Sequence, residues 1–362
     1  MKILFDIGHP AHVHFFKYII RNLEKDHHEI QICVREREDI VKKLLEYYNF
    51  NYENLEKNTP GLFIKAIAMF KNDCKLIKIS KRFNPDIYVS LASPYSAQVS
   101  KLLGRHSITF TDSEPTGLTL ALTMPFTDVI ITPSGFARNL GKKQIRISGY
   151  KELAYLHPNW YKPKSDILKI LGISKYEPYV ILRFSAFDAN HDIGIKGFSL
   201  EDKRRLVKEL GKYAKVFISS EAKLPLDLEK YCIDIPQNRM HDALYYASML
   251  VGDTQTSTTE AACLGTPAVR CNSFVGQNDM SNFIELEKIY GLIFNYNIPE
   301  KAMEKSIELI QQQDIKEKWA NKKEKLHKEK IDVTAFLTWF IENYPESLRM
   351  VKENPYFQER FR

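Results

Sequence analysis

Four consecutive hydroxyl-bearing side chains at residues 256–259 (Thr-Ser-Thr-Thr) could take part in ligand binding. They follow a short apolar run at residues 249–251 and a Gly-Asp turn, and the segment ends at Gly265 and Pro267, which are typical of a helix terminus. The sequence therefore predicts a strand, a turn and a helix. Backbone amides in the first turn of a helix point outward with partial positive charge, so this segment predicts a phosphate-binding site that needs neither a lysine nor a metal.

Two roles are open for Glu260, which comes directly after these hydroxyl-bearing residues. Ser257 and Glu260 have the three-residue spacing of a capping box, in which the serine oxygen accepts from helix amides and the glutamate reaches back to the cap amide. As a ligand-binding group, Glu260 would instead accept hydrogen bonds from the two ribose hydroxyls of a nucleotide. The serine can serve both roles, whereas the two roles compete for the glutamate.

Three histidines, His9, His12 and His14, follow the apolar run at residues 3–7. Open α/β sheets bind ligands at the carboxyl ends of their strands, so these histidines are candidates for a second site. Each could instead cap the next helix or pack locally. We expect no metal here, because no cysteine or carboxylate lies beside them at ligand spacing, and His12 and His14 would diverge at a helix start.

Polar side chains also follow other apolar runs. Asp112 and Glu114 could share a cleft with the histidines, and their alternative role is to form the turn and cap before a helix at Leu118. In the second half of the chain, Arg183 could neutralise a diphosphate. The other candidates at strand ends in this half are Ser185, His191, Asp192, Ser220, Glu221, Gln277, Asn278 and Asp279.

Short apolar runs alternate with helical patterns along the chain, which predicts an α/β fold with two doubly wound domains. The first covers residues 1–155, with strands expected at 3–7, 29–34, 87–91, 107–110, 128–131 and 144–147. The second covers residues 160–330, with strands expected at 179–184, 215–219, 232–235, 249–251 and 268–271. The tail at 332–362 is rich in aromatic residues, which predicts packed helices.

The composition is that of a soluble globular protein of 362 residues, with 27% charged and 44% hydrophobic residues. We expect no membrane-spanning segment, because no apolar run approaches about 20 residues, and we see no signal peptide. The five cysteines are scattered, which predicts free thiols and a cytoplasmic location. A net charge of +7 does not by itself distinguish nucleic acid, an anionic membrane surface or an acidic substrate as the partner.

The segment from Glu260 and Ala261 to Gly265 and Pro267 resembles the nucleotide-binding half of glycosyltransferases of the GT-B fold. His12 and Val13 fall on the Gly-His-Val segment of the peptidoglycan lipid-precursor N-acetylglucosaminyltransferase, although the glycine-rich run of that family is missing here. Over its whole length the chain is most similar to the domain-of-unknown-function 354 family. The supporting stretches are 9–16, 112–114, Arg183 with 191–192, 219–221 and 252–267.

This resemblance implies a metal-independent, inverting glycosyltransferase with two Rossmann-like domains and a C-terminal helix that crosses back to the first. The donor would be a nucleotide sugar, UDP-linked, and the acceptor a cell-surface glycan or a polyprenyl-linked sugar, with no cofactor. His12 would be the base that takes the proton of the acceptor hydroxyl, because histidine titrates near neutral pH, and His9 and His14 would lie on the acceptor side. The resemblance further implies that residues 277–279 contact donor-sugar hydroxyls.

Two other functions remain open at this stage. An enzyme similar to UDP-N-acetylglucosamine 2-epimerase would share the fold and the ribose-binding glutamate, and Glu114 could serve its chemistry, but residues 89–93 lack the Gly-Asp-Thr carboxylate expected there. A non-catalytic nucleotide- or nucleic-acid-binding module is the third possibility, and no nucleic-acid motif supports binding to nucleic acid.

A long helix is expected at residues 62–83, with apolar residues on one arc and four basic residues beside it. Core packing with a solvated basic edge is the favoured interpretation. The alternative is peripheral attachment to anionic lipid headgroups on the inner face of the membrane. The basic residues are Lys71, Lys75, Lys78 and Arg82.

Overall fold

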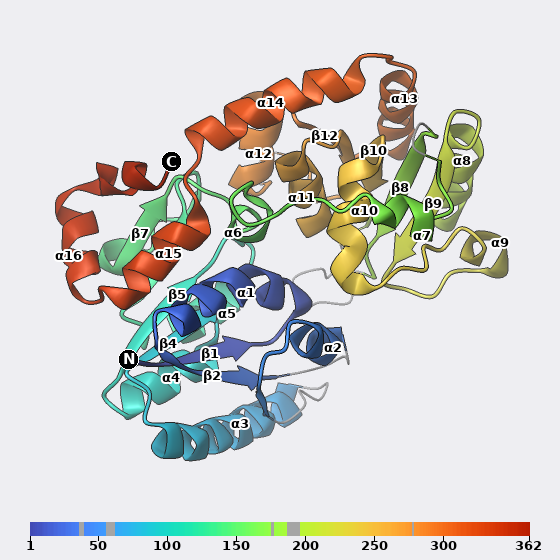
Figure 1. Ribbon diagram of the computed structural model, residues 1–362. Helices are drawn as coiled ribbons and strands as arrows, with labels where there is room; N and C mark the ends of the chain where they lie inside the picture. Colours follow the sequence, from blue (N-terminus) through green and yellow to red (C-terminus); the bar gives the residue numbers. More distant parts are fainter. Residues whose placement is uncertain (36–39, 56–61, 175–176, 187–195, 277–278) are drawn as a thin grey trace. The chain divides into compact units, whose positions relative to one another are not determined.

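A computed structural model divides the chain into two compact α/β units (Figure 1). Unit 1 comprises Met1–Tyr155 and Lys330–Arg362, and unit 2 comprises Leu156–Glu329. The structure describes residues 1–35, 40–55, 62–174, 177–186, 196–276 and 279–362, and for residues 62–70 it describes the backbone alone.

The described part of unit 1 contains a parallel sheet of seven strands in the order β3-β2-β1-β4-β5-β6-β7. The interior strand β1 is fully buried at Ile3, Leu4, Phe5 and Ile7, as expected for a parallel strand covered on both faces. The six strands expected from the sequence are confirmed, and the two-residue β3 is an addition. The strands are β1 (Lys2–Ile7), β2 (Glu29–Val34), β3 (Glu53–Asn54), β4 (Ile87–Leu91), β5 (His106–Phe110), β6 (Val129–Pro133) and β7 (Gln144–Ile147).

Helices cover both faces of this sheet, and the C-terminal helices belong to the same unit, as predicted (Figure 1). Asn22 in α1 donates from Nδ2 to Thr338 Oγ1 in α15 at 3.4 Å, and the Trp339 and Phe357 rings stack at 4.7 Å. The helical elements are α1 (Pro10–Lys25), α2 (Ile40–Tyr47), α3 (Leu62–Phe83), α4 (Pro94–Leu102), α5 (Gly117–Thr123), η1 (Gly141–Lys143), α6 (Leu153–Leu156, at the unit boundary), α15 (Val333–Glu342), α16 (Glu346–Glu353) and η3 (Pro355–Phe361).

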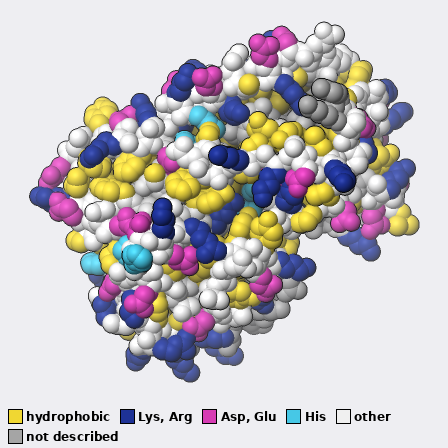
Figure 2. Space-filling model, viewed as in Figure 1, with side chains coloured by type: hydrophobic (Ala, Val, Ile, Leu, Met, Phe, Trp, Pro, Cys, Tyr) yellow, Lys and Arg dark blue, Asp and Glu magenta, His cyan; other side chains and the backbone are white. Residues whose placement is uncertain are grey.

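α3 presents a basic side to solvent, and Figure 2 shows Lys and Arg side chains gathered over this helix. Lys71, Lys75 and Lys78 are exposed, whereas Leu76 and Ile79 are buried in the core. Core packing with a solvated basic edge is therefore confirmed for residues 71–83. The lipid contact stays a prediction.

Unit 2 contains, among its described residues, a parallel sheet of five strands in the order β12-β11-β10-β8-β9. The strands are β8 (Tyr179–Phe184), β9 (Lys215–Ser220), β10 (Met249–Gly252), β11 (Ala268–Cys271) and β12 (Ile293–Tyr296). The helical elements are α7 (Asp166–Ile170), α8 (Leu200–Leu210), α9 (Leu226–Glu229), η2 (Gln237–Arg239), α10 (Met240–Tyr246), α11 (Thr256–Leu264), α12 (Ser281–Lys288), α13 (Pro299–Ile310) and α14 (Ile315–Glu329).

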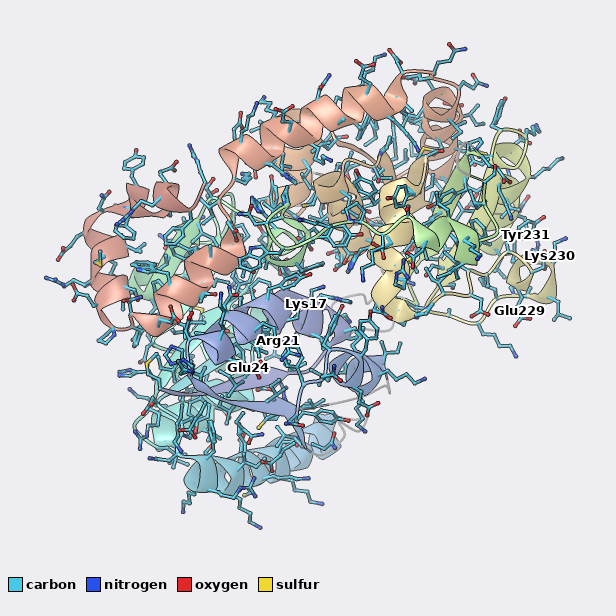
Figure 3. The ribbon with its side chains drawn as sticks, in the orientation of Figure 1. Lys17, Arg21, Glu24, Glu229, Lys230 and Tyr231 are labelled. Atoms are coloured by element: carbon cyan, nitrogen blue, oxygen red, sulfur yellow. The ribbon has the colours of Figure 1, made fainter. Side chains whose placement is uncertain are left out.

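The prediction of a strand at residues 232–235 is wrong. Cys232 makes a single bridge with Ile218 in the edge strand β9, just after the segment labelled at Glu229, Lys230 and Tyr231 in Figure 3. The run cannot extend the ladder, because it is short and ends at Pro236, which lacks a backbone donor. The other four expected strands are confirmed, and β12, which was not expected, is the fifth strand of the described sheet.

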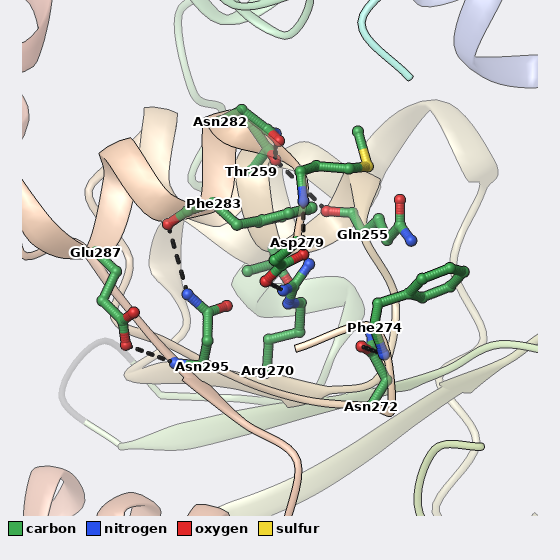
Figure 4. A network of polar contacts seen from close by, with 12 residues as sticks. Gln255, Thr259, Arg270, Asn272, Phe274, Asp279, Asn282, Phe283, Glu287 and Asn295 are labelled. Atoms are coloured by element: carbon green, nitrogen blue, oxygen red, sulfur yellow. Dashed lines mark hydrogen bonds and ion pairs between the residues drawn. The ribbon is translucent and has the colours of Figure 1, made fainter. Parts of the chain in front are cut away.

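A buried arginine connects β11 to the start of α12. Arg270 has no exposed surface, forms an ion pair with Asp279, and holds its guanidinium carbon 3.6 Å from the centroid of the Phe283 ring (Figure 4). Burial lowers the pKa of Arg270 to about 10, so the group stays charged near pH 7. Within the described residues, Asp279 is the anion that balances this charge.

Replacing Asp279 by Ala should therefore destabilise the protein strongly. Removing one partner of a buried pair leaves an uncompensated charge, which typically costs about 3–5 kcal/mol, whereas removing both charges costs less. We expect urea unfolding to show a large decrease in the free energy of unfolding for Asp279→Ala. The decrease should be smaller for the Arg270→Leu, Asp279→Leu double variant. Asp227→Ala, which breaks the exposed pair with Arg204, is the control and should have little effect. A double variant less stable than Asp279→Ala would contradict this account.

Candidate functional site

The N-terminus of α11 lies at the carboxyl end of β10, as the sequence predicts. The helix begins at Thr256, and the side chain of its cap residue, Gln255, makes no capping hydrogen bond. Ser257 is consequently the second helical residue and does not occupy the cap. The capping-box hypothesis is wrong, because the helix starts too early for Ser257 to cap it. The first-turn amides therefore point from a helix end whose cap residue, Gln255, makes no side-chain capping hydrogen bond.

Two of the hydroxyls predicted to bind phosphate face the interior. Thr258 donates from Oγ1 to the Thr254 carbonyl at 2.7 Å, and its side chain is buried, as is that of Thr259. Thr259 donates weakly to the Gln255 carbonyl and accepts from Asn282 Nδ2 at 3.2 Å. Both side chains therefore stabilise the helix and its packing. Ser257, which is half-buried, remains a candidate together with the first-turn amides.

Glu260 is held by a histidine that the sequence analysis did not select. His241, in α10, places Nε2 2.9 Å from Glu260 Oε1, and both side chains are buried. The two residues are nineteen positions apart, so no local spacing could reveal this contact. The pair fixes one oxygen of the carboxylate that is expected to accept hydrogen bonds from the ribose hydroxyls.

The carboxyl ends of β8 and β9 are joined by a polar network around Glu221. Arg183 donates from Nη1 to Ser219 Oγ at 2.9 Å and from Nη2 to Glu221 Oε1 at 2.7 Å. Ser185 donates from Oγ to Glu221 Oε2 at 3.0 Å. The structure brings together Arg183, Ser185 and Glu221, three of the residues predicted to bind the donor. The charge of Arg183 is balanced by Glu221, however, so the arginine does not present a net positive charge to a diphosphate.

The other predicted donor-site residues do not meet at this network. Ser220 donates from Oγ to the Ala222 carbonyl at 2.7 Å and so forms a local turn. Both oxygens of Asp279 are engaged, one by Arg270 and one by the Met280 amide, which corrects its assignment to the donor sugar. The predictions for His191, Asp192, Gln277 and Asn278 lie outside the described residues.

Asp253, which directly follows β10, is a second residue that the sequence analysis did not select. Its carboxylate accepts from the Ser185 amide at 2.7 Å and from the Phe198 amide at 3.3 Å, and it is 1% exposed. A Cβ on Gly197 would lie 2.2 Å from Asp253 Oδ2, so only glycine fits there. Burial raises the pKa of Asp253 to about 6, although the hydrogen bond from the Ser185 amide and the charge of Lys203 act to lower it.

In unit 1, two of the three histidines lie at the carboxyl end of β1. His9 is exposed and caps α1, because its Nδ1 accepts from the Ala11 amide at 3.1 Å. His12 is half-buried, and its Nδ1 accepts from the Gly8 amide at 3.3 Å. The two rings are 5.9 Å apart. The capping interpretation is therefore confirmed for His9.

Burial lowers the pKa of His12 well below its usual range, and the charges of Arg35 and Lys151 act in the same direction. The imidazole is thus neutral near pH 7. Because Nδ1 accepts from Gly8, the proton of the neutral ring sits on Nε2 in this arrangement. A base that uses Nε2 needs the proton on Nδ1, which breaks the Gly8 contact and leaves two N–H donors facing each other. At 3.3 Å this contact is weaker than an ordinary hydrogen bond.

His14 packs among aromatic side chains. Its ring lies 5.6 Å from that of Tyr155 and 6.3 Å from that of Tyr48, and it is 8% exposed. One turn further along α1, Lys17 (labelled in Figure 3) places its ammonium 5.0 Å from the Tyr48 ring centroid. His14 is therefore part of the packed interior, which corrects its assignment to the acceptor side.

The two predicted catalytic carboxylates are both engaged by neighbours. Lys151 places Nζ 2.8 Å from Asp112 Oδ2, and both side chains are largely buried. Glu114 accepts from the Ala137 amide through Oε1 at 3.3 Å. Asp112 thus balances one of the charges that act on His12, and Glu114 anchors a loop.

A hydrogen-bonded cluster that the sequence analysis did not select joins the ends of β1, β2 and β4. Asp6 has no exposed surface and accepts from Arg35 Nε at 2.8 Å and from the Ser93 hydroxyl. Arg35 also donates from Nη2 to Ser93 Oγ at 2.9 Å. The available signal was an acidic residue inside the apolar run of the first strand. Its partners lie 29 and 87 residues away, so their identity could not be read.

Metal ligands and membrane spans were searched across the described residues. There, no group of three or more His, Cys, Asp or Glu side chains is arranged to hold a metal ion. Likewise, none of the helices in this part of the chain combines the length and apolar character needed to cross a membrane.

The chain belongs to the family described as protein of unknown function DUF354, whose model matches residues 1–291. It is 25% identical over 281 residues to an uncharacterized protein of Methanocaldococcus jannaschii, covering 75% of this chain and 82% of that protein. The family model confirms the family assignment made from the sequence.

Solved structures with the same fold include S. aureus MnaA with UDP, with a TM-score of 0.68, 10% identity, and coverage of 96% of this chain and 97% of that one. The UDP-GlcNAc 2-epimerase of Neisseria meningitidis bound to UDP-GlcNAc has a TM-score of 0.63 and 14% identity, and the coverage is 88% and 94%. The rhamnosyltransferase SpnG with spinosyn aglycone has a TM-score of 0.63 and 10% identity, and the coverage is 95% and 100%. The predicted GT-B fold is confirmed.

The buried Asp253 should make stability depend on pH. A carboxyl group whose pKa is raised on folding stabilises the protein most below its unfolded pKa, and this contribution is lost as pH rises through the folded value of about 6. Between pH 4 and pH 7 we expect the free energy of unfolding of the wild type to fall by about 2 kcal/mol more than that of Asp253→Asn. Urea unfolding of both proteins across this range measures the difference, and parallel profiles would refute the assignment.

Proposed function

We propose that this protein is a metal-independent glycosyltransferase that transfers a sugar from a UDP-linked donor to a glycan or lipid-linked acceptor of the cell envelope. The observation that carries the proposal is the N-terminus of α11, where the cap residue Gln255 makes no side-chain capping hydrogen bond, followed by Glu260 on the same helix. The GT-B fold supports a nucleotide sugar as the ligand. The reaction would take place on the cytoplasmic side of the membrane.

The donor nucleotide would lie along the first turns of α11. Its diphosphate would accept from the first-turn amides near Ser257, where the helix dipole also favours negative charge. Glu260 is four residues after Thr256, which corresponds to about 6 Å along a helix. That separation is comparable to the distance from a diphosphate to the ribose hydroxyls of the same nucleotide. One helix could therefore bind both groups without a metal.

The acceptor would react at the histidines of unit 1. A neutral imidazole is required of a base, and the lowered pKa keeps His12 neutral near pH 7. His12 would take the proton of the acceptor hydroxyl as that oxygen attacks the anomeric carbon and the nucleoside diphosphate leaves. Asp112 and Lys151 would act indirectly by setting the electrostatic potential at the ring.

A second candidate function is 2-epimerisation of a UDP-sugar, favoured by the likeness to MnaA and to the N. meningitidis epimerase. The end of β4 carries Ser90 and Ser93 where that chemistry would need an acid. Asp6 lies beside them, but Arg35 and Ser93 occupy both of its oxygens. This arrangement favours glycosyl transfer. Conversion of UDP-GlcNAc to its 2-epimer without an acceptor would favour the epimerase.

UDP should bind in the presence of EDTA. At about one hundred times its dissociation constant a ligand adds about 2.7 kcal/mol to stability, so a thermal-shift panel of nucleoside diphosphates should identify the base. Glu260→Gln should weaken binding about 10- to 100-fold, because hydrogen bonds to a charged group contribute about 1.5–3 kcal/mol. Glu209→Gln, at a partly exposed position on α8 that pairs with Lys212, is the matched control. Equal affinities of wild type and Glu260→Gln would exclude the ribose role.

His12→Ala should reduce the rate of transfer about 100- to 10,000-fold, the usual contribution of a general base, with nucleotide affinity unchanged. Because the pKa of His12 is lowered, the wild-type rate should stay constant as pH falls to 6.5 and decline only at lower pH. Sugar transfer measured from pH 5 to 8 tests both expectations. If His12→Ala keeps its activity while Asp112→Asn or Glu114→Gln loses it, the base is a carboxylate.

A further inference from the structure

The contact between His241 and Glu260 is unusual in being a buried pair within the candidate nucleotide site. His241 Nε2 lies 2.9 Å from Glu260 Oε1, and the side chains are only 5% and 8% exposed. α10 and α11 pack directly against each other. A carboxylate buried to this degree needs hydrogen-bond donors, and His241 supplies one from a neighbouring helix.

His241 is itself held in place by its surroundings. The next residue, Asp242, accepts from Tyr161 Oη at 2.7 Å, from the Lys164 amide at 3.0 Å and from Arg239 Nε at 2.6 Å. The Tyr161 ring also packs edge-on against the His241 ring, with centroids 6.3 Å apart. The start of α10 is therefore fixed, and the direction of the Nε2–H bond is fixed with it.

We propose that His241 is a positioning residue for ribose recognition, which orients the Glu260 carboxylate so that the protein selects ribonucleotides over 2′-deoxyribonucleotides. The proposal rests on the proposed nucleotide site. A glutamate side chain has three rotatable bonds, and a hydrogen bond to Oε1 fixes the plane of its carboxylate. The carboxylate then presents its lone pairs to the ribose hydroxyls without an ordering cost at the moment of binding.

Selection against the deoxy sugar follows from the same burial. A site built to accept a hydroxyl rejects an analogue that lacks it, because the buried acceptor loses a partner and stays desolvated. Without His241, the carboxylate would sample several rotamers, and the penalty for the missing hydroxyl would fall. The signature of positioning is thus a change in the ratio of the two affinities.

The experiment measures dissociation constants of UDP and 2′-deoxy-UDP by calorimetry for wild type, Glu260→Gln, His241→Phe and His241→Gln. Phenylalanine keeps the ring without a donor, whereas glutamine carries an amide that can reach the position of Nε2. We expect His241→Phe to weaken UDP about tenfold (about 1.4 kcal/mol) and 2′-deoxy-UDP far less, so that selectivity falls as in Glu260→Gln. His241→Gln should restore most of it.

A role in packing alone would weaken both ligands equally in His241→Phe, and an unchanged ratio would overturn the proposal. Should His241→Phe fail to fold, His241→Asn replaces it, because the shorter amide cannot reach Glu260. His241→Asn must then show a lower selectivity for UDP over 2′-deoxy-UDP than His241→Gln. If Glu260→Gln loses selectivity but neither His241 variant does, this inference fails and the nucleotide site stands. If wild type binds neither nucleotide, both fail.

Discussion

Burial of α11 along most of its length is the constraint on which the candidate nucleotide site depends. Every residue from Thr258 to Leu264 is buried, and the helix ends at Gly265, whose φ of 77° places it in the left-handed region that favours glycine. A helix enclosed in this way cannot shift without disturbing its neighbours, because protein interiors are close-packed. Its first-turn amides and Glu260 therefore keep a fixed geometry, which is what recognition of a diphosphate and a ribose would require.

Three arginine or lysine side chains near the strand ends of the two units are balanced by partners of opposite charge. Arg35 pairs with Asp6 and Lys151 with Asp112 in unit 1, and Arg183 pairs with Glu221 in unit 2. Such pairs fix the loops that leave the strands, but they offer little net charge to a ligand. The groups best suited to recognition are then the backbone amides of α11 and a neutral imidazole. This is consistent with chemistry that relies on dipoles and proton transfer.

The sequence predicts elements more reliably than contacts. Continuous apolar runs identified β1, β8 and β10, whereas β12 was missed because its residues, Ile-Phe-Asn-Tyr, do not form an apolar run. The strand end before α11 was correctly placed. The roles of Thr258 and Thr259, however, depended on which face of the helix is buried. A helix that is buried on most sides has no hydrophobic periodicity that would reveal this face. Asp6, His241 and Asp253 were missed because their partners are distant in sequence and only the fold brings them together.

The connections of unit 2 are tied to the same helix. The chain enters unit 2 at Leu156 and leaves it at Glu329, and the rings of His157 and His327 stack with their centroids 5.7 Å apart. His327 Nε2 lies 3.0 Å from the Cys263 carbonyl in the last turn of α11. Burial lowers the pKa of His327 to about 4, so a neutral ring donates this bond near pH 7. The last turn of α11 is therefore tied to the segments through which the chain enters and leaves the unit.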